Sequence, residues 1–80
     1  MGKLQDQMDR ELRIRGYAEN TRINYLRAMR ALVRHFMRSP DELSLEHVKQ
    51  YQLFLTKEKR VSWSMFNLHA SAIRFFYREV

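Results

Sequence analysis

Residues 19–37, which read ENTRINYLRAMRALVRHFM, decide the fold because their apolar side chains recur at helical spacing. At intervals of three, four and seven residues, one stripe collects Tyr25, Leu26, Met29, Leu32, Val33 and Phe36. We therefore predict a long amphipathic helix over Glu19–Met37, with this stripe buried in a core.

A further helix is expected before this segment, over Lys3–Arg15, where Leu4, Met8 and Leu12 recur every four residues. Gly16 follows it, and a glycine just past the last helical residue commonly ends a helix. The two helices are therefore expected to be separated by only a short break.

Three helical segments are expected after the long helix over Glu19–Met37. Ser39 as a cap and Pro40 at the first helical position suit a single helical turn. Ser44 then caps a third helix that ends in the charged run 57–60, and Ser62 caps a fourth that runs to the end of the chain. The apolar residues of this fourth helix cover more than one face, so it either lies at the centre of the fold or offers a second face to a partner.

The composition favours one all-α domain over residues 1–80. A chain of 80 residues can bury one modest core, and Gly 2 with Pro 1 is too few for a many-turned β-protein. We therefore predict a compact four-helix bundle. The start of the chain is charged, and no stretch reaches the roughly 18 apolar residues of a membrane span, so a cytoplasmic protein without membrane contact is expected.

Positive charge is concentrated in the long helix. The chain has a net charge of +6, of which residues 19–38 contribute +4. The basic residues of that segment are all arginines: Arg22, Arg27, Arg30, Arg34 and Arg38. A guanidinium suits phosphate and guanine edges, although a merely solvated face on a basic protein is the alternative.

Polar side chains form a row on each of two helices. The row on the second helix lies opposite the apolar stripe and holds Asn20, Asn24, Arg27, Arg34 and Arg38. The row on the fourth helix holds Asn67, Ser71, Arg74 and Arg78, with Lys59, Arg60 and Ser64 near the helix start. Because Asn and Arg read base edges and Ser donates to phosphate, the two rows favour nucleic-acid binding.

The sequence shows no constellation of catalytic residues. His35, His47 and His69 fall on three different helices, so no metal site is expected, and two isolated glycines cannot form a phosphate loop. Packing explains Tyr17 in a turn and the core-type positions of Tyr25, Tyr51 and Tyr77. We therefore expect no cofactor and no small-molecule substrate.

Trp63 follows the Ser62 cap and admits two interpretations. It could stack on a base or a sugar, or it could close the edge of the core, which is the commoner role of a Trp at a helix start.

Two blocks of the sequence resemble the start of tyrosine recombinases of the phage and integron integrase family. The first is similar to the pattern G-Y-S-x-x-T…Y…L…F and comprises Gly16, Tyr17, Thr21, Tyr25, Leu26, Leu32 and Phe36. The second is similar to a pattern that starts S-P-x-x-L and ends R-F-x-Y-R, and it comprises Ser39, Pro40, Leu43, Val48, Tyr51, Phe54, Leu55, Val61, Ser62, Asn67, Ala70, Ala72, Ile73, Arg74, Phe75, Phe76, Tyr77 and Arg78. Together they cover nearly the whole chain, in order.

This resemblance implies a SAM-like core-binding domain that clamps double-stranded DNA together with a separate catalytic domain. The catalytic Arg, His and Tyr residues of the family belong to that second domain, so this fragment is not expected to be an enzyme. The resemblance also implies that the second and fourth helices face the DNA. It further implies a bacterial or phage-encoded, nucleoid-associated protein of a mobile element, whose full-length form assembles as a tetramer on DNA.

The chain departs from the family pattern at two places. Ala18 stands where a capping Ser is usual, which weakens the start of the long helix by about 1 kcal/mol. Met65, Phe66 and Leu68 replace residues that are usually polar, which leaves fewer groups for DNA there and favours a hydrophobic partner surface.

Two functional hypotheses follow. The first is the DNA-binding domain of a site-specific recombinase that serves DNA integration, with DNA contacts from Asn20, Thr21, Arg22, Asn24, Arg27, Arg30, Arg34, Arg38, Lys59, Arg60, Ser64, Asn67, Ser71 and Arg74. The alternative is a helical protein-interaction module that docks a partner on Phe66, Leu68, Phe75 and Tyr77. A helix-turn-helix regulator is disfavoured, because the break at residues 57–61 is basic and has no glycine.

Overall fold

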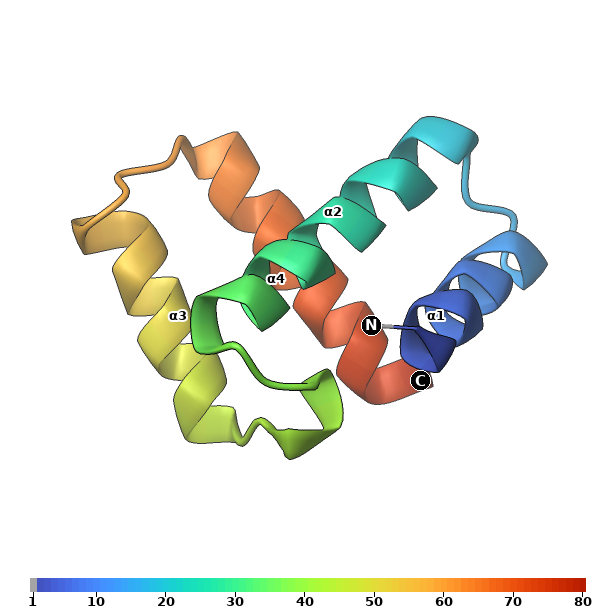
Figure 1. The fold of residues 1–80 in the computed structure, drawn as a ribbon. Helices are drawn as coiled ribbons and strands as arrows, with labels where there is room; N and C mark the ends of the chain where they lie inside the picture. Colours follow the sequence, from blue (N-terminus) through green and yellow to red (C-terminus); the bar gives the residue numbers. More distant parts are fainter. Residues whose placement is uncertain (1) are drawn as a thin grey trace.

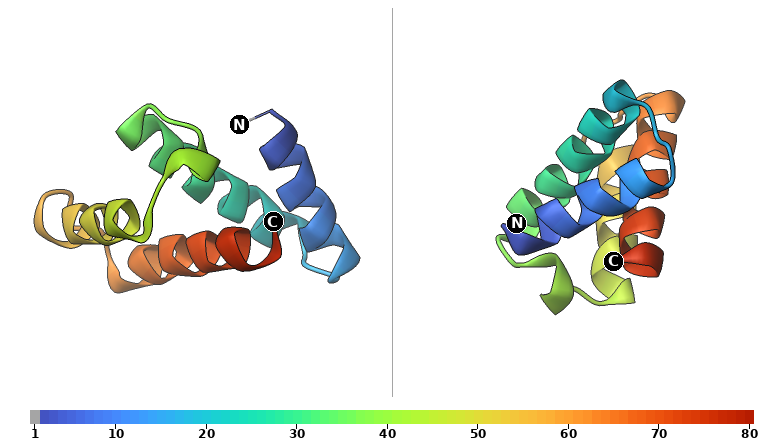
Figure 2. Two further views of the ribbon diagram at one scale, coloured as in Figure 1. Left: turned by 90° about the horizontal axis from the view of Figure 1, so that it is seen from below. Right: turned by 90° about the vertical axis from the view of Figure 1, so that its right-hand side faces the viewer.

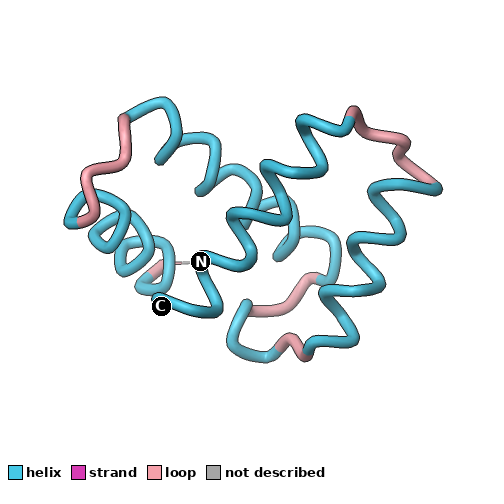
Figure 3. The backbone as a smooth tube through the Cα atoms, turned by 180° about the vertical axis from the view of Figure 1, so that it is seen from behind, coloured by secondary structure: helices cyan, strands magenta, loops and turns pink. Residues whose placement is uncertain are grey.

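The computed structural model describes residues 2–80, which form four α-helices and one short 3-10 helix without any strand (Figure 1). The α-helices are α1 (Lys3–Ile14), α2 (Glu19–Phe36), α3 (Leu45–Lys57) and α4 (Trp63–Glu79), and the 3-10 helix η1 (Pro40–Glu42) lies between α2 and α3. The predicted all-α fold is confirmed, and the first two helices each end one residue earlier than expected. Only short loops join the helices, as Figure 3 shows from behind.

The fourth helix lies at the centre of the fold. This was the first of the two explanations for its wide apolar surface, the other being a second face for a partner. The helix packs against α1, α2 and α3, and it crosses α2, with α1 and α3 on either side of the crossing (Figure 1; Figure 2). The domain measures 35 × 27 × 18 Å. Within residues 2–80, no helix is both long enough and apolar enough to cross a membrane.

The core is built from the apolar stripes of all four helices. Its buried side chains are Met8, Leu12, Leu26, Ala28, Met29, Leu32, Tyr51, Leu55, Ala72, Ile73, Phe75 and Phe76. Each large aliphatic or aromatic side chain buried in this way contributes about 1.5–3 kcal/mol to folding. Phe75 is therefore part of the core and not an exposed docking residue, which corrects that element of the protein-interaction hypothesis.

The turn between α1 and α2 depends on Gly16. This glycine has a φ of 78°, a left-handed conformation that side chains with a Cβ disfavour. Its N–H donates to the carbonyl of Arg13 at 3.0 Å, and the N–H of Tyr17 donates to the carbonyl of Leu12 at 3.0 Å. This hydrogen-bond pair closes the C-terminus of α1 and directs the Tyr17 ring onto Tyr25 and Phe75.

Serine caps begin α3 and α4 as predicted. The N–H of Met65 donates to Oγ of Ser62 at 3.2 Å, and Ser44 forms a reciprocal capping pair with His47. The predicted helical turn forms as η1 with Ser39 at its N-cap position, but the Ser39 hydroxyl bonds to the carboxylate of Asp41 and caps no backbone N–H of η1. Pro40 does occupy the first position of that turn.

Two contacts fix the C-terminal end of α4. The Tyr77 hydroxyl donates to the carbonyl of Pro40 at 2.6 Å, and burial raises the pKa of this hydroxyl. Arg15, at the end of α1, pairs with Glu79, and its hydrogen bond lowers the pKa of that carboxyl. Tyr77 was expected in the core, but it is 42% exposed and its hydroxyl bonds to η1.

Candidate nucleic-acid interface

A groove lies between α2 and the start of α4, and its cavity has a volume of about 300 Å³. Its lining residues are Asn24, Arg27, Ala28 and Ala31 of α2, Lys59 and Val61 of the α3–α4 connection, and Met65, Leu68 and His69 of α4. None of these lining residues is acidic. Three of the predicted DNA contacts, Asn24, Arg27 and Lys59, are therefore brought together from two segments that are far apart in the sequence.

Helical periodicity and one unusual backbone turn position these three side chains. Asn24, Arg27 and Ala31 are spaced three and four residues apart, so they share one side of α2. The Lys59 N–H donates to the carbonyl of Phe54 at 3.0 Å, which holds the connection against the end of α3. Arg60 then turns the chain with a φ of 51°, a left-handed conformation uncommon for a residue other than glycine.

His69 also lines the groove, and it was not among the residues predicted from the sequence. Its Nδ1 atom is buried and has no hydrogen-bond partner in the part of the chain that the structure describes. Burial, and then the positive charge of Lys59, lower the pKa of the imidazole, which favours its neutral form. Its spacing of four residues from Met65 would have indicated this inner side of α4, but the prediction followed the opposite, polar row.

Two of the five arginines predicted over residues 19–38 turn toward α1 instead of the groove. The Nε of Arg22 lies 3.5 Å from Oδ1 of Asp9, and this guanidinium side chain is only 16% exposed. The Nε of Arg30 donates to Oε1 of Gln5 at 3.2 Å. Both side chains therefore help to attach α1 to α2.

The polar row of α4 lies on the side of that helix opposite the groove. Met65, Leu68 and His69 face α2, and the helical repeat places Asn67 and Arg74 on the reverse side. Asn67 is exposed and Ser71 is half-buried. The structure therefore does not combine the α4 row with Asn24 and Arg27 in one site.

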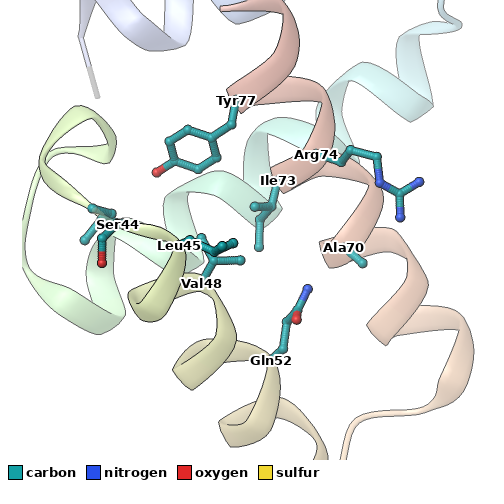
Figure 4. A pocket seen from close by; sticks show the side chains of 9 residues that line it. Ser44, Leu45, Val48, Gln52, Ala70, Ile73, Arg74 and Tyr77 are labelled. Atoms are coloured by element: carbon teal, nitrogen blue, oxygen red, sulfur yellow. The ribbon is translucent and has the colours of Figure 1, made fainter.

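Arg74 borders a second cavity, between α3 and α4, of about 360 Å³ (Figure 4). Most of the cavity lining is apolar: Leu43, Leu45, Val48, Ala70 and Ile73, with Ser44, Gln52, Arg74 and Tyr77 as the polar members. The side chain of Arg74 extends away from the side chains of Val48 and Ile73 (Figure 4). This cavity suits an apolar group better than a phosphate.

The remaining predicted contacts lie on the surface around the groove. Asn20, Arg34, Arg38, Arg60 and Ser64 are exposed, and Thr21 is half-buried. Within residues 2–80, Arg27, Arg34, Arg38, Lys59 and Arg60 form no ion pair. These five cations can therefore meet an external polyanion without breaking an internal contact.

The sequence of residues 4–80 matches the protein family described as "Phage integrase, N-terminal SAM-like domain". The chain belongs to this family. The predicted kinship with the integrases is thereby confirmed, and so is the SAM-like fold.

A relative of this integrase domain is the "Putative integrase/recombinase y4qK" of Sinorhizobium fredii, which is 32% identical over 77 residues. The match covers 96% of the chain but only 25% of the relative, so the chain spans about a quarter of that protein's length. No solved structure matches the integrase domain.

Proposed function

We propose that this integrase domain binds duplex DNA through the groove between α2 and α4 and holds it at a recombination site. One observation carries the proposal: Asn24, Arg27 and Lys59 converge on a groove whose lining has no acidic residue. Phosphates attract the two cations, and the Asn24 amide can bond to a base edge or to a phosphate. Arg34 of α2 and Arg38, two residues beyond its end, are exposed and extend the basic surface.

The salt dependence of DNA binding tests this proposal. If the five cations without ion pairs each neutralise one phosphate, log affinity falls against log salt with a slope of roughly −4 to −5. The measurement is a fluorescence-anisotropy titration of the 80-residue chain with a duplex of about 20 base pairs, at three salt concentrations, and we expect weak binding with little sequence preference. A slope near −1 would contradict the phosphate contacts.

A matched pair of charge reversals then locates the site. Arg27→Glu with Arg34→Glu should abolish binding, because it places two carboxylates at the basic surface. The control, Arg10→Glu with Lys49→Glu, changes the net charge by the same amount at exposed positions of α1 and α3. Equal losses in both variants would show that only total charge matters.

The wider role of the protein follows from this proposal. Cleavage and rejoining of DNA would belong to a catalytic domain outside residues 1–80, and the full-length integrase would assemble as a tetramer on its site. DNA binding would place it in the cytoplasm at the nucleoid. Sedimentation of a longer integrase with and without site DNA tests the assembly.

The cavity between α3 and α4 supports a second candidate, a protein-interaction module. Its apolar lining and the 70% exposed side chain of Leu45 could receive an apolar side chain of a partner. Ala70→Trp would fill this cavity. If partner binding is the function, this variant loses it while Arg27→Glu with Arg34→Glu retains it.

A further inference from the structure

The start of α4 carries an aromatic side chain that the groove does not use. Trp63 is the only Trp in the sequence, and its side chain is 73% exposed, so it does not close the edge of the core. Its ring lies parallel to that of Phe66, with an interplanar angle of 10° and 5.6 Å between the ring centroids. Phe66 is half-buried and packs against the core, so the exposed indole stacks on a side chain that is anchored in the fold.

The charge around this pair is positive. Lys59 and Arg60 precede it in the connection and are exposed, whereas Glu58 is the one acidic residue between positions 57 and 66. Lys59 also lines the groove proposed to bind DNA, whereas the helical repeat places Trp63, four residues before Asn67, on the opposite side of α4. The basic connection between α3 and α4 therefore lies between the groove and the aromatic pair in the sequence.

The start of α3 provides an internal comparison. Leu45, like Trp63, is the first residue after a capping serine, and its side chain is 70% exposed. Its sequence neighbours Asp41, Glu42 and Glu46 are acidic. Position and exposure are therefore alike at the two helix starts, but only Trp63 combines an aromatic face with basic neighbours.

We propose that Trp63 is a stacking platform for an unpaired DNA base, with Lys59 and Arg60 on the adjoining phosphates. An indole face and a nucleobase stack irrespective of base identity, and cations alongside hold the strand. A base inside a duplex is already stacked on both faces and has no free face for the indole. This site therefore selects extrahelical or single-stranded nucleotides. The inference rests on the proposed DNA binding and adds a preference for DNA structure.

The single Trp makes the test direct, because all indole emission reports on this site. The probes are a 20-base-pair duplex, the same duplex with a central bulge of two thymines, and a short oligothymidylate. We expect the bulged duplex and the oligothymidylate to quench Trp63 emission. The bulged duplex should also bind about fivefold or more tightly than the paired one, because stacking of one base contributes at least about 1 kcal/mol.

Two variants assign the effect to the indole. Trp63→Ala, followed by anisotropy of labelled DNA, should remove the preference for the bulge and leave affinity for the paired duplex within twofold. Leu45→Ala removes an equally exposed apolar side chain and should retain the preference. Circular dichroism on heating verifies that each variant is folded.

The outcomes separate this inference from the proposed function. Equal affinity for bulged and paired duplex in the unaltered protein, or a preference that survives Trp63→Ala, overturns the platform while duplex binding stands. Quenching by oligothymidylate without any binding of the paired duplex overturns the groove proposal and supports the platform.

Discussion

The arginines of α2 divide into two groups that the sequence alone does not distinguish. Arg22 and Arg30 turn toward Asp9 and Gln5 of α1, whereas Arg27 and Arg34 point to solvent and form no ion pair within residues 2–80. The first group supports packing between helices and the second is available to a polyanion. A count of basic residues therefore overestimates the surface that can bind DNA.

The largest effect is expected from removing each pair of arginines in turn. Arg27→Ala with Arg34→Ala should weaken duplex binding about a hundredfold or more, because hydrogen bonds to charged groups contribute about 1.5–3 kcal/mol each. The salt slope should become shallower by about two. Anisotropy titrations measure both, and denaturation in urea should show little change in stability.

The opposite pair should give the opposite result. Arg22→Ala with Arg30→Ala should lower the free energy of unfolding by about 1–2 kcal/mol, mainly through the buried stem of Arg22, and leave the salt slope unchanged. If this pair also flattens the salt slope, both groups contact DNA and the division of α2 into two faces is wrong.

The fold was largely predictable because it depends on local patterns. The stripe from Tyr25 to Phe36, the glycine at position 16 and the serines at 44 and 62 specify helices within a few residues of themselves. The site depended instead on how two helices cross. Helical periodicity placed Asn24 on the polar row of α2 and Asn67 on the polar row of α4. It could not show that the row of α4 faces away from α2.

A smaller effect is expected from the uncapped start of α2. Ala18 makes no side-chain hydrogen bond to the helix, so Ala18→Ser should stabilise the protein by about 1 kcal/mol. The variant changes no charge and affects both groups of arginines alike. Thermal unfolding should shift upward while the salt slope of DNA binding stays constant. A changed slope would indicate that order in α2, and not charge alone, sets the number of phosphate contacts.

Arg60 tests whether an outward arginine is kept at the expense of stability. Its φ of 51° suits glycine, so Arg60→Gly should raise the free energy of unfolding by about 0.5–1 kcal/mol. The same change should flatten the salt slope by about one, because it removes one proposed phosphate contact. Arg60→Lys is the control that keeps the charge and the backbone conformation. A variant that is more stable and binds DNA equally well would remove Arg60 from the interface.

The smallest effect concerns pH and arises from His69. This side chain lines the groove with Arg27 and Lys59, and its ring centroid lies 6.0 Å from that of Tyr51 of α3. Burial and Lys59 hold the pKa of His69 below its ordinary value of 6.5, so the unfolded chain binds a proton more readily than the folded one. The stability contributed by neutral His69 is therefore complete above about pH 6.5 and declines as the pH falls from there toward the folded pKa.

DNA should reverse this trend. A phosphate in the groove offsets the charge of Lys59 and raises the pKa of His69, so binding takes up a proton and affinity increases by up to a few fold as the pH falls below about 6.5. Urea denaturation and anisotropy between pH 5 and 8 measure the two opposing trends, and His69→Gln, which is neutral throughout, should flatten both. Glu79 does not interfere, because its pKa lies below 4.5 and its contribution is lost only at lower pH. If acid weakens the fold but leaves affinity constant, the groove holds no phosphate near His69, and the outward arginines alone carry the contact.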